Sequence, residues 1–165
     1  MATVIGYFIS NGPYWADSPD SKQHNDHRFV NTYLYQDSYC HIVIETLFDA
    51  DGSGGSFLTE KTYKCFKFAQ PFVLIGPAGS LQTLRDAGYK TFDNVIDNRY
   101  DNIKDNTERW LYARTAIAKI YHQNRQQFLE DCMPDIKHNQ QWFLRTQKQQ
   151  LNELCNKLAV NTDLV

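Results

Sequence analysis

The chain has 165 residues, of which 42% are hydrophobic and 22% charged, and its formal net charge is −2 at pH 7. This length and composition predict one globular domain with its own core and exclude an intrinsically disordered chain. The balance of 17 basic against 19 acidic side chains makes nucleic acid an unlikely main partner, although local basic clusters could still bind phosphates.

Neither the apolar runs nor the cysteines indicate a membrane or secreted protein. No apolar run approaches the roughly 20 residues of a membrane span, and the start MATVIGYFISNG lacks the basic region of a secretory signal. The cysteines are widely spaced without a C-x-x-C pair, which favours reduced thiols over a zinc site or a disulfide framework: Cys40, Cys65, Cys132 and Cys155. We therefore expect a cytoplasmic protein.

The first third of the chain predicts strands separated by polar loops. Residues 3–9, TVIGYFI, favour a short strand, and residues 10–28 favour a long polar loop. Residues 38–48 are β-branched and apolar, with an unbroken run at 42–44. Such continuity is typical of a strand covered on both faces, as in a parallel sheet. A glycine-rich loop at residues 51–56 follows.

The next segment has the pattern of a helix followed by a buried strand. Residues 59–70 carry apolar side chains at helical spacing, with Thr59 as the expected N-cap. Pro71 ends this helix. Residues 72–76, FVLIG, then predict a second buried strand.

A second turn and helix complete the repeating pattern. Residues 77–80, PAGS, predict a tight turn with Ser80 as N-cap, and Gly88 ends the helix that follows. Residues 89–92, YKTF, predict a third short strand. Strands that alternate with helices over about 55 residues are typical of right-handed βαβ units. The predicted fold class is therefore α/β, with a Rossmann-like parallel sheet.

The remainder, residues 105–158, predicts a C-terminal pair of helices. One begins at Thr107, reaches Phe128 and closes before Pro134, and the second spans roughly residues 138–158. We expect them to cover the sheet or each other, with a partner-binding or dimerising hairpin as the alternative. The acidic side chains that recur every fourth residue before these helices are expected in loops and caps: Asp93, Asp97, Asp101 and Asp105.

The segment DADGSGGSFLTE matches much of a calcium-binding EF-hand loop. Oxygen donors, a glycine and a glutamate stand at the expected positions: Asp49, Asp51, Ser53, Gly54 and Glu60. An EF-hand needs a helix on each side, whereas the residues before this loop predict a strand. We therefore expect no EF-hand, and keep Asp49 and Asp51 only as weak metal candidates. His24, Asp26 and His27 are a weaker metal alternative to a solvated polar loop.

The same loop can instead lead into a phosphate-binding helix. Ligands of open α/β sheets bind beyond the carboxyl ends of the strands, where the glycine loops at 51–56 and 76–79 are expected. Each loop leads into a helix N-terminus with unpaired N–H groups. Lys61 adds a positive charge, and the Glu60 carboxylate suits ribose hydroxyls. A diphosphate-linked ribose fits this arrangement; the alternative is that Glu60 balances the helix dipole and Lys61 is solvated.

Roughly residues 38–110 resemble the C-terminal, nucleotide-sugar-binding half of GT-B glycosyltransferases. The resemblance lies in the order E-T … F-L-T-E-K-T-Y-K … P-F-V-L-I-G-P-A-G-S-L … G-Y-K-T-F. The nearest pattern is that of the α1,3-fucosyltransferase-like family. The segment is also similar to a broad group of phage and marine bacterial proteins. If the chain is a phage protein, the expected location is the cytoplasm of the host cell. The resemblance implies that Glu60 contacts the ribose and Lys61 the diphosphate of a nucleotide-sugar donor.

The donor site predicted from the pattern and the resemblance comprises the Thr-Glu-Lys motif and the two glycine turns: Thr59, Glu60, Lys61, Gly54, Gly55, Gly76, Gly79 and Ser80. The nucleotide sugar is expected as a substrate, without a tightly bound cofactor. His41 and Glu45 are weak candidates for catalysis, with a core histidine as the alternative for His41. Glu45 stands where the family has an aromatic-Glu-Asn pattern, but here Thr46 follows.

The chain departs from the family in length. A GT-B enzyme has two Rossmann-like halves, and the first supplies most of the acceptor site and the catalytic base. Residues 1–37, the predicted N-terminal strand and loop, are too few for that half, so residues 1–165 are expected to form a single half-GT-B domain. The chain would then be a fragment, a half that assembles with another copy or a partner, or a non-catalytic nucleotide- or protein-binding module.

Overall fold

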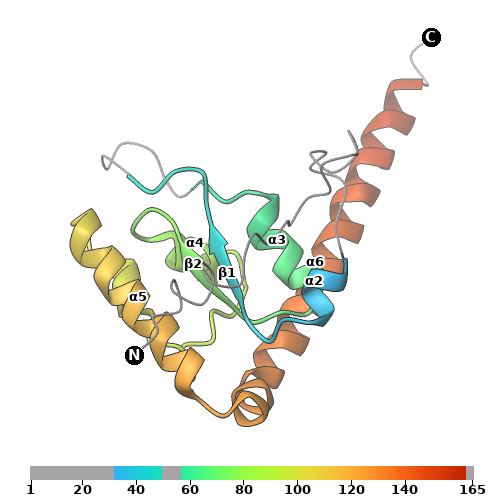
Figure 1. The fold of residues 1–165 in the computed structure, drawn as a ribbon. Coiled ribbons are helices and arrows are strands. Elements are labelled where there is room, and N and C mark those ends of the chain that lie inside the picture. Colours follow the sequence, from blue (N-terminus) through green and yellow to red (C-terminus); the bar gives the residue numbers. More distant parts are fainter. Residues whose placement is uncertain (1–31, 50–56, 163–165) are drawn as a thin grey trace, which may run out of the picture. The chain divides into compact units, whose positions relative to one another are not determined.

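The computed structural model describes residues 32–49 and 57–162. The predicted strand at residues 3–9, the polar loop at 10–28 and the glycine-rich loop at 51–56 lie outside the described residues. The described elements follow one another in this order (Figure 1): α2 (Thr32–Gln36), β1 (His41–Ile44), α3 (Glu60–Lys67), β2 (Phe72–Ile75), α4 (Ser80–Asp86), the 3₁₀ helix η1 (Asn98–Asn102), α5 (Asn106–His122) and α6 (Arg125–Thr162).

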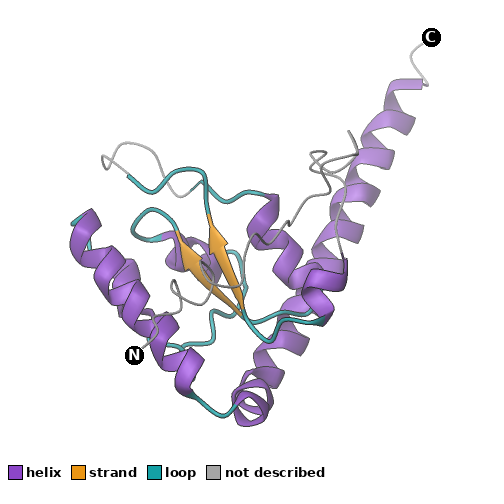
Figure 2. Ribbon diagram, in the orientation of Figure 1, coloured by secondary structure: helices purple, strands orange, loops and turns teal. Residues whose placement is uncertain are grey.

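The strands β1 and β2 form a parallel pair joined by α3 (Figure 2). His41 is in register with Phe72, and Ile44 with Ile75. A helix that connects two parallel neighbours is the βαβ arrangement expected from the alternating pattern. The mixed α/β class is therefore confirmed for the described residues.

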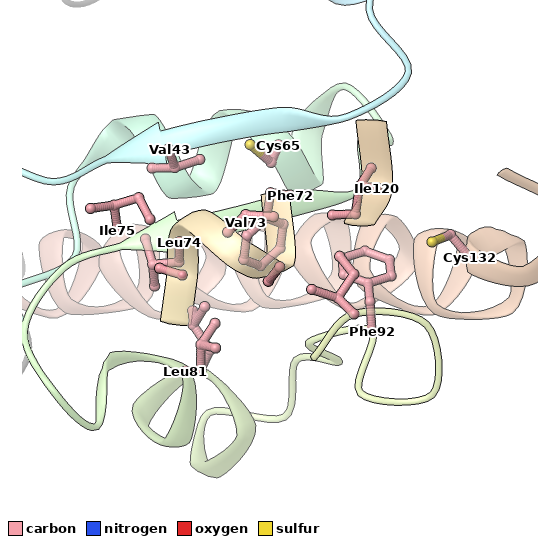
Figure 3. Packing of buried hydrophobic residues seen from close by; sticks show 14 of the residues in the cluster. Val43, Cys65, Phe72, Val73, Leu74, Ile75, Leu81, Phe92, Ile120 and Cys132 are labelled. Atoms are coloured by element: carbon pink, nitrogen blue, oxygen red, sulfur yellow. The ribbon is translucent and has the colours of Figure 1, made fainter. Parts of the chain in front are cut away.

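All four residues of β2 are buried, and this strand is the centre of the core. The helices α3 and α6 lie on one side of the strands and α5 on the other (Figure 1). Figure 3 shows part of the buried cluster, in which the rings of Phe72 and Phe92 meet edge to face with centroids 5.5 Å apart. Burial of such side chains supplies most of the stability of a domain of this size.

The expectation that the first described strand is covered on both faces is wrong for β1. Val43 is buried, but Ile42 is 47% and Ile44 62% exposed. Side chains alternate between the faces of a strand, so Ile42 and Ile44 share the face opposite Val43. The helix α5 packs on β2, and its cover does not extend over these two isoleucines.

The third strand predicted at residues 89–92 is also wrong. The backbone N–H and C=O of Lys90 pair with the side-chain amide of Asn139 at 2.7 and 2.8 Å, instead of with a neighbouring strand. The carbonyl of Thr91 accepts a hydrogen bond from the Asn98 side chain. Phe92 then adopts a left-handed conformation with φ of 62°, which ends any extended run.

Both helices of the βα units begin close to the predicted positions. Thr59 is the N-cap of α3, and its hydroxyl accepts the N–H of Lys61. At α4 the cap is Gly79, with φ of 84°, rather than Ser80. Ser80 is the first helical residue, and its hydroxyl donates to the Pro77 carbonyl at 2.7 Å instead of accepting from the helix. The predicted cap is therefore wrong by one residue.

The C-terminal ends of α3 and α4 share one hydrogen-bond pattern. At α4, Gly88 has φ of 90° and donates to Arg85, while Tyr89 donates to Leu84. This is the Schellman arrangement predicted from Gly88. A Cβ on Gly88 would also lie 2.8 Å from the Trp142 ring, so the residue is fixed by conformation and by space.

The same pattern ends α3 without a glycine. Ala69 donates to Phe66 and Gln70 to Cys65, and Ala69 has φ of 55°. An alanine in this left-handed position is strained by its Cβ, because only glycine adopts the conformation without a steric cost.

The C-terminal helices divide at a different place from the predicted one. The helix α5 begins at Asn106 with Asp105 as its N-cap, and the break follows at Gln123 and Asn124. The Asn124 side chain accepts the N–H of Gln127 and so starts α6, a signal that the sequence interpretation missed. Pro134, expected to end a helix, lies inside α6.

The first half of α6 packs against the rest of the described fold. Its buried residues are Phe128, Cys132, Ile136 and Asn139. The helix contacts α3, where the rings of Phe143 and Tyr63 meet, and Asn139 bonds Lys90 after α4. Trp142 Nε1 donates to the Ala87 carbonyl at 2.9 Å, and His138 Nε2 lies 2.8 Å from the Gly88 carbonyl. Among the described residues, no helix combines the length and apolar character needed to cross a membrane.

Replacing Ala69 by glycine is expected to stabilise the protein by about 1 kcal/mol, because glycine removes the Cβ strain of the left-handed residue. Urea denaturation measures the free energy of unfolding. The matched control is Ala87→Gly at the end of α4, where φ is −79° and glycine only adds flexibility to the unfolded chain. Equal or opposite effects of the two substitutions would contradict the prediction.

Candidate functional site

The carboxyl ends of the two strands bring several predicted site residues together. We call this region, formed by Glu45, Thr59, Lys61, Gly76 and Ser80, the carboxyl edge. A Cβ on Gly76 would lie 3.3 Å from the Ser80 hydroxyl and 3.7 Å from Glu45 Cβ. The end of β2 thus lies against both Glu45 and the start of α4, and only the contact with Ser80 would be tight for a larger residue.

Glu45 is the centre of the hydrogen bonding at this edge. Its carboxylate is 4% exposed and accepts three hydrogen bonds. The N–H of Thr59 donates to Oε1 at 3.0 Å and its hydroxyl to Oε2 at 2.5 Å, and the Thr62 hydroxyl donates to Oε1 at 2.6 Å. The carboxylate thus joins the end of β1 to the first turn of α3, where the helix dipole favours a negative charge.

This environment gives Glu45 a positioning role rather than a catalytic one. A general base must reach the proton that it accepts, in a position open to the substrate. The three donors already occupy the Glu45 carboxylate, and the side chain is buried. The structure therefore does not support the use of Glu45 as a base.

Lys61 presents its ammonium group at the carboxyl edge. The half-buried side chain places Nζ 3.3 Å from the Thr46 hydroxyl and 3.4 Å from the Thr59 hydroxyl. The ion pairs formed among the described residues all lie elsewhere, so none of these carboxylates neutralises Lys61. Glu60 beside it is exposed. The motif therefore presents the Lys61 ammonium, hydrogen-bonded to two hydroxyls, and the solvent-exposed Glu60 carboxylate.

The N-terminus of α4, by contrast, is already filled by a carboxylate of the chain. The buried Asp101 side chain accepts the N–H groups of Leu81 at 2.9 Å and Gln82 at 3.0 Å. Its burial raises the pKa of Asp101 above the usual range of a carboxyl group. These N–H groups are the ones expected to hold a phosphate, so Gly79 and Ser80 lead into an occupied helix end.

The base of the glycine-rich loop is attached to α5. Arg109, only 2% exposed, donates to the carbonyls of Phe48 at 2.7 Å and Ile103 at 2.9 Å. Its guanidinium also lies over the Phe48 ring, 4.4 Å from the centroid. Asn106 donates to the Asp49 carboxylate. The end of the β1 segment is therefore held where the loop begins.

The metal candidates find no support among the described residues. The segment before the loop is the strand β1, as expected, and not the entering helix of an EF-hand. Asp49 is engaged by Asn106, while Asp51, Gly54 and Gly55 lie outside the described residues, as do His24, Asp26 and His27. In the ranges that the structure describes, no group of three His, Cys, Asp or Glu side chains is placed to hold a metal ion.

His41 lies at the wrong end of the strand for a catalytic role. It is the first residue of β1, and Ile44 at the carboxyl end is about 10 Å away along the strand. The imidazole stacks on the Tyr35 ring with centroids 4.8 Å apart. The position of His41 therefore does not support the catalytic role considered for it, and the half-buried ring instead packs against Tyr35.

Burial makes three of the four cysteines poor nucleophiles. All four are free thiols, with Cys65 and Cys132 buried and Cys155 exposed. Burial raises the pKa of Cys40 and of Cys132 to about 12, which keeps these thiols protonated at neutral pH. Four free thiols agree with the reduced state expected from their spacing.

A polar cavity of about 530 Å³ beside α4 and η1 was not anticipated from the sequence. It contains two arginines, but each has an acidic partner. Arg85 pairs with Asp93 at 3.2 Å, and Arg99 with Asp97 at 2.7 Å. Both arginines of this cavity are therefore already paired with carboxylates.

Comparison with protein-family models, curated proteins and solved structures finds no match to this chain. Function is therefore inferred from the geometry of the carboxyl edge and from the sequence pattern that leads to it.

Replacing Glu45 by glutamine is expected to lower the free energy of unfolding by about 2 kcal/mol, because charge-assisted hydrogen bonds to the start of α3 are lost. Urea denaturation gives the value directly. The control Glu60→Gln removes the same charge from an exposed position and should cost less than about 1 kcal/mol. A loss no larger than that of the control would show that Glu45 does not hold the helix.

Titration of His41 is expected to make the protein less stable in acid. Burial lowers the pKa of His41 below its ordinary 6.5, so the unfolded chain binds the proton first as the pH falls. Stability is then lost from about pH 6.5 down to the lower pKa of the folded state. His41→Phe keeps a ring against Tyr35 and should lose less free energy of unfolding between about pH 8 and about pH 5. Equal losses in the two proteins would contradict this assignment.

Proposed function

We propose that the chain is a nucleotide-sugar-binding domain of the glycosyltransferase type, with the donor bound at the carboxyl edge. The observation that carries the proposal is the Lys61 ammonium group, held by two threonine hydroxyls beside the carboxyl ends of parallel strands. Open α/β sheets bind their ligands at this end. The sequence pattern around Thr59, Glu60 and Lys61 supports the same ligand class.

The geometry favours Lys61 as the contact to the diphosphate. Its half-buried side chain is fixed by Thr46 and Thr59, and both partners are neutral hydroxyls. A lysine ammonium has three donors, and a cation in a partly desolvated place attracts an anion more strongly than one in bulk water. Lys61 is therefore the residue whose loss should weaken binding of the phosphates most.

Glu60 is suited to the ribose. It lies in the first turn of α3 next to Lys61, and its side chain is exposed. An ionised carboxylate accepts hydrogen bonds but donates none, so it pairs with hydroxyl groups and repels phosphates. Adjacent positions on the helix would thus discriminate between the two parts of one ligand.

Glu45 and Asp101 limit where the diphosphate can lie. Asp101 occupies the backbone donors of α4, which leaves the start of α3 as the binding element. Glu45 is buried and hydrogen-bonded to Thr59 and Thr62, so its charge is directed into the fold. A phosphate at Lys61 would contact the outer side of this network.

A binding module without catalysis is the second candidate. An inverting sugar transfer needs a base to accept the proton of the acceptor hydroxyl. His41 is stacked on Tyr35 at the other end of β1, and Glu45 is occupied by three donors. Release of sugar from the donor, with and without candidate acceptors, would separate an enzyme from a protein that only binds.

Calorimetric titration with UDP-, GDP- and ADP-sugars tests the proposed site. Lys61→Met should weaken the best ligand by about tenfold or more, because a hydrogen bond to a charged group is lost. Lys67→Met is the matched control, since this lysine is exposed in the last turn of the same helix. Equal losses in both variants would indicate non-specific attraction, and no binding to any sugar nucleotide would refute the proposal.

The role of Glu60 is tested by the sugar of the nucleotide itself. Glu60→Gln should weaken ribonucleotide donors more than their 2′-deoxy counterparts, because only the former lose the ribose hydroxyl contact. Binding of the two donors to the native protein provides the baseline. The same reduction for both donors would assign Glu60 to the helix dipole instead.

A further inference from the structure

The second half of α6 does not pack against the described part of the chain. Every side chain from Gln147 to Leu158 is exposed, and the red end of the helix continues past the strands (Figure 1). Four of its leucines are 54–59% exposed: Leu144, Leu151, Leu154 and Leu158. A helix gains most of its stability from packing an apolar face, so such a segment needs a partner surface.

The leucines lie on a different face from the one that packs inside the protein. The packed face ends at the half-buried Phe143 and Thr146. Its continuation by helical spacing is polar, with Gln150, Glu153 and Lys157. The apolar positions therefore change direction where the contact with the body ends. This change indicates that the leucines serve a contact outside the described fold.

We infer that this leucine stripe pairs with the same stripe of a second copy in a short parallel coiled coil. The spacing of seven, three and four residues from Leu144 to Leu158 places all four leucines at the a and d positions of heptads. In a parallel pair in register, each leucine meets its own counterpart. Gln147 occupies the remaining d position, where the two amides can donate to and accept from each other.

The antiparallel alternative matches less well. Centred on Leu151 and Leu154, it would place Leu158 opposite Gln147 and leave leucine and amide layers mismatched. The parallel register avoids this, because Gln147 faces only its own copy. A single polar layer within an apolar seam is a device that fixes register in coiled coils.

The charges beside the seam are compatible with a second copy. Lys148 and Cys155 occupy the e positions, and Gln150 and Lys157 the g positions. In the parallel register a g residue faces the e residue of the next heptad on the other copy, so Gln150 faces Cys155. Lys148 and Lys157 do not face each other, and no like charges oppose one another across the seam.

The area of the stripe sets the expected strength. Four half-exposed leucines leave on the order of 400 Å² of apolar surface per copy, as large as the patches by which monomers bind partners. Residues 144–158 extend about 21 Å along the helix, and pairing two copies would cover about 1,000 Å² in total. This is at the lower limit of specific interfaces, so the dimer should dissociate on dilution.

Sedimentation velocity over a dilution series of the full chain, from high micromolar to high nanomolar, tests the inference. The native protein should pass from dimer to monomer. Leu151→Gln with Leu154→Gln should weaken association by at least about a hundredfold. The control Gln149→Ala with Asn156→Ala changes the opposite face of the same turns and should leave association intact. Unchanged far-ultraviolet circular dichroism would show that each variant is folded.

A monomer at all concentrations, or a dimer that survives the two leucine substitutions, would overturn the inference. The orientation has its own test in Leu154→Cys, made together with Cys155→Ser. The two introduced thiols meet only in the parallel register and should form an intermolecular disulfide on mild oxidation. A dimer that fails to cross-link at this position would overturn the parallel arrangement.

Discussion

A buried carboxylate at the start of a helix is the interaction on which the described fold depends. Glu45 accepts hydrogen bonds from both ends of the first turn of α3 and so joins that helix to β1. Without it, the half-buried N–H and hydroxyl of Thr59 and the buried hydroxyl of Thr62 would lose their acceptor. The same contact sets the direction in which Thr59, Glu60 and Lys61 leave the strand. Stability and site geometry therefore depend on one side chain.

The two βα units use this device with different consequences. At α4 the carboxylate of Asp101 takes the backbone donors themselves, and the helix end is closed to other anions. At α3 the Glu45 carboxylate takes the cap residue and leaves the Lys61 ammonium beside it. The glycine loops before α3 and α4 look alike in the sequence, but the helix ends that they lead into differ in how open they are to an anion. The difference comes from residues outside each loop, one of them at the end of the preceding strand and the other 20 residues further along the chain.

Local chemistry made much of the fold predictable. The Thr59 cap, the buried strand after Pro71 and the turn at Gly88 depend on neighbours in sequence, and all three are found. The errors depend on distant partners. Asn139 pairs with Lys90 in place of a neighbouring strand, and no residue near Lys90 in the sequence predicts this contact. For the site, the Thr-Glu-Lys motif was visible as a pattern, whereas the placement of Asp101 required the folded chain.

The pairing of Asn139 with Lys90 also leaves no free backbone group at Lys90 for another chain to pair with. An extended segment with free backbone groups is a template on which other polypeptides can aggregate. Here a side-chain amide imitates a neighbouring peptide and saturates both groups of Lys90. An incoming strand would first have to displace α6 from this position. The long helix thereby occupies the backbone groups of Lys90 to which another strand could pair.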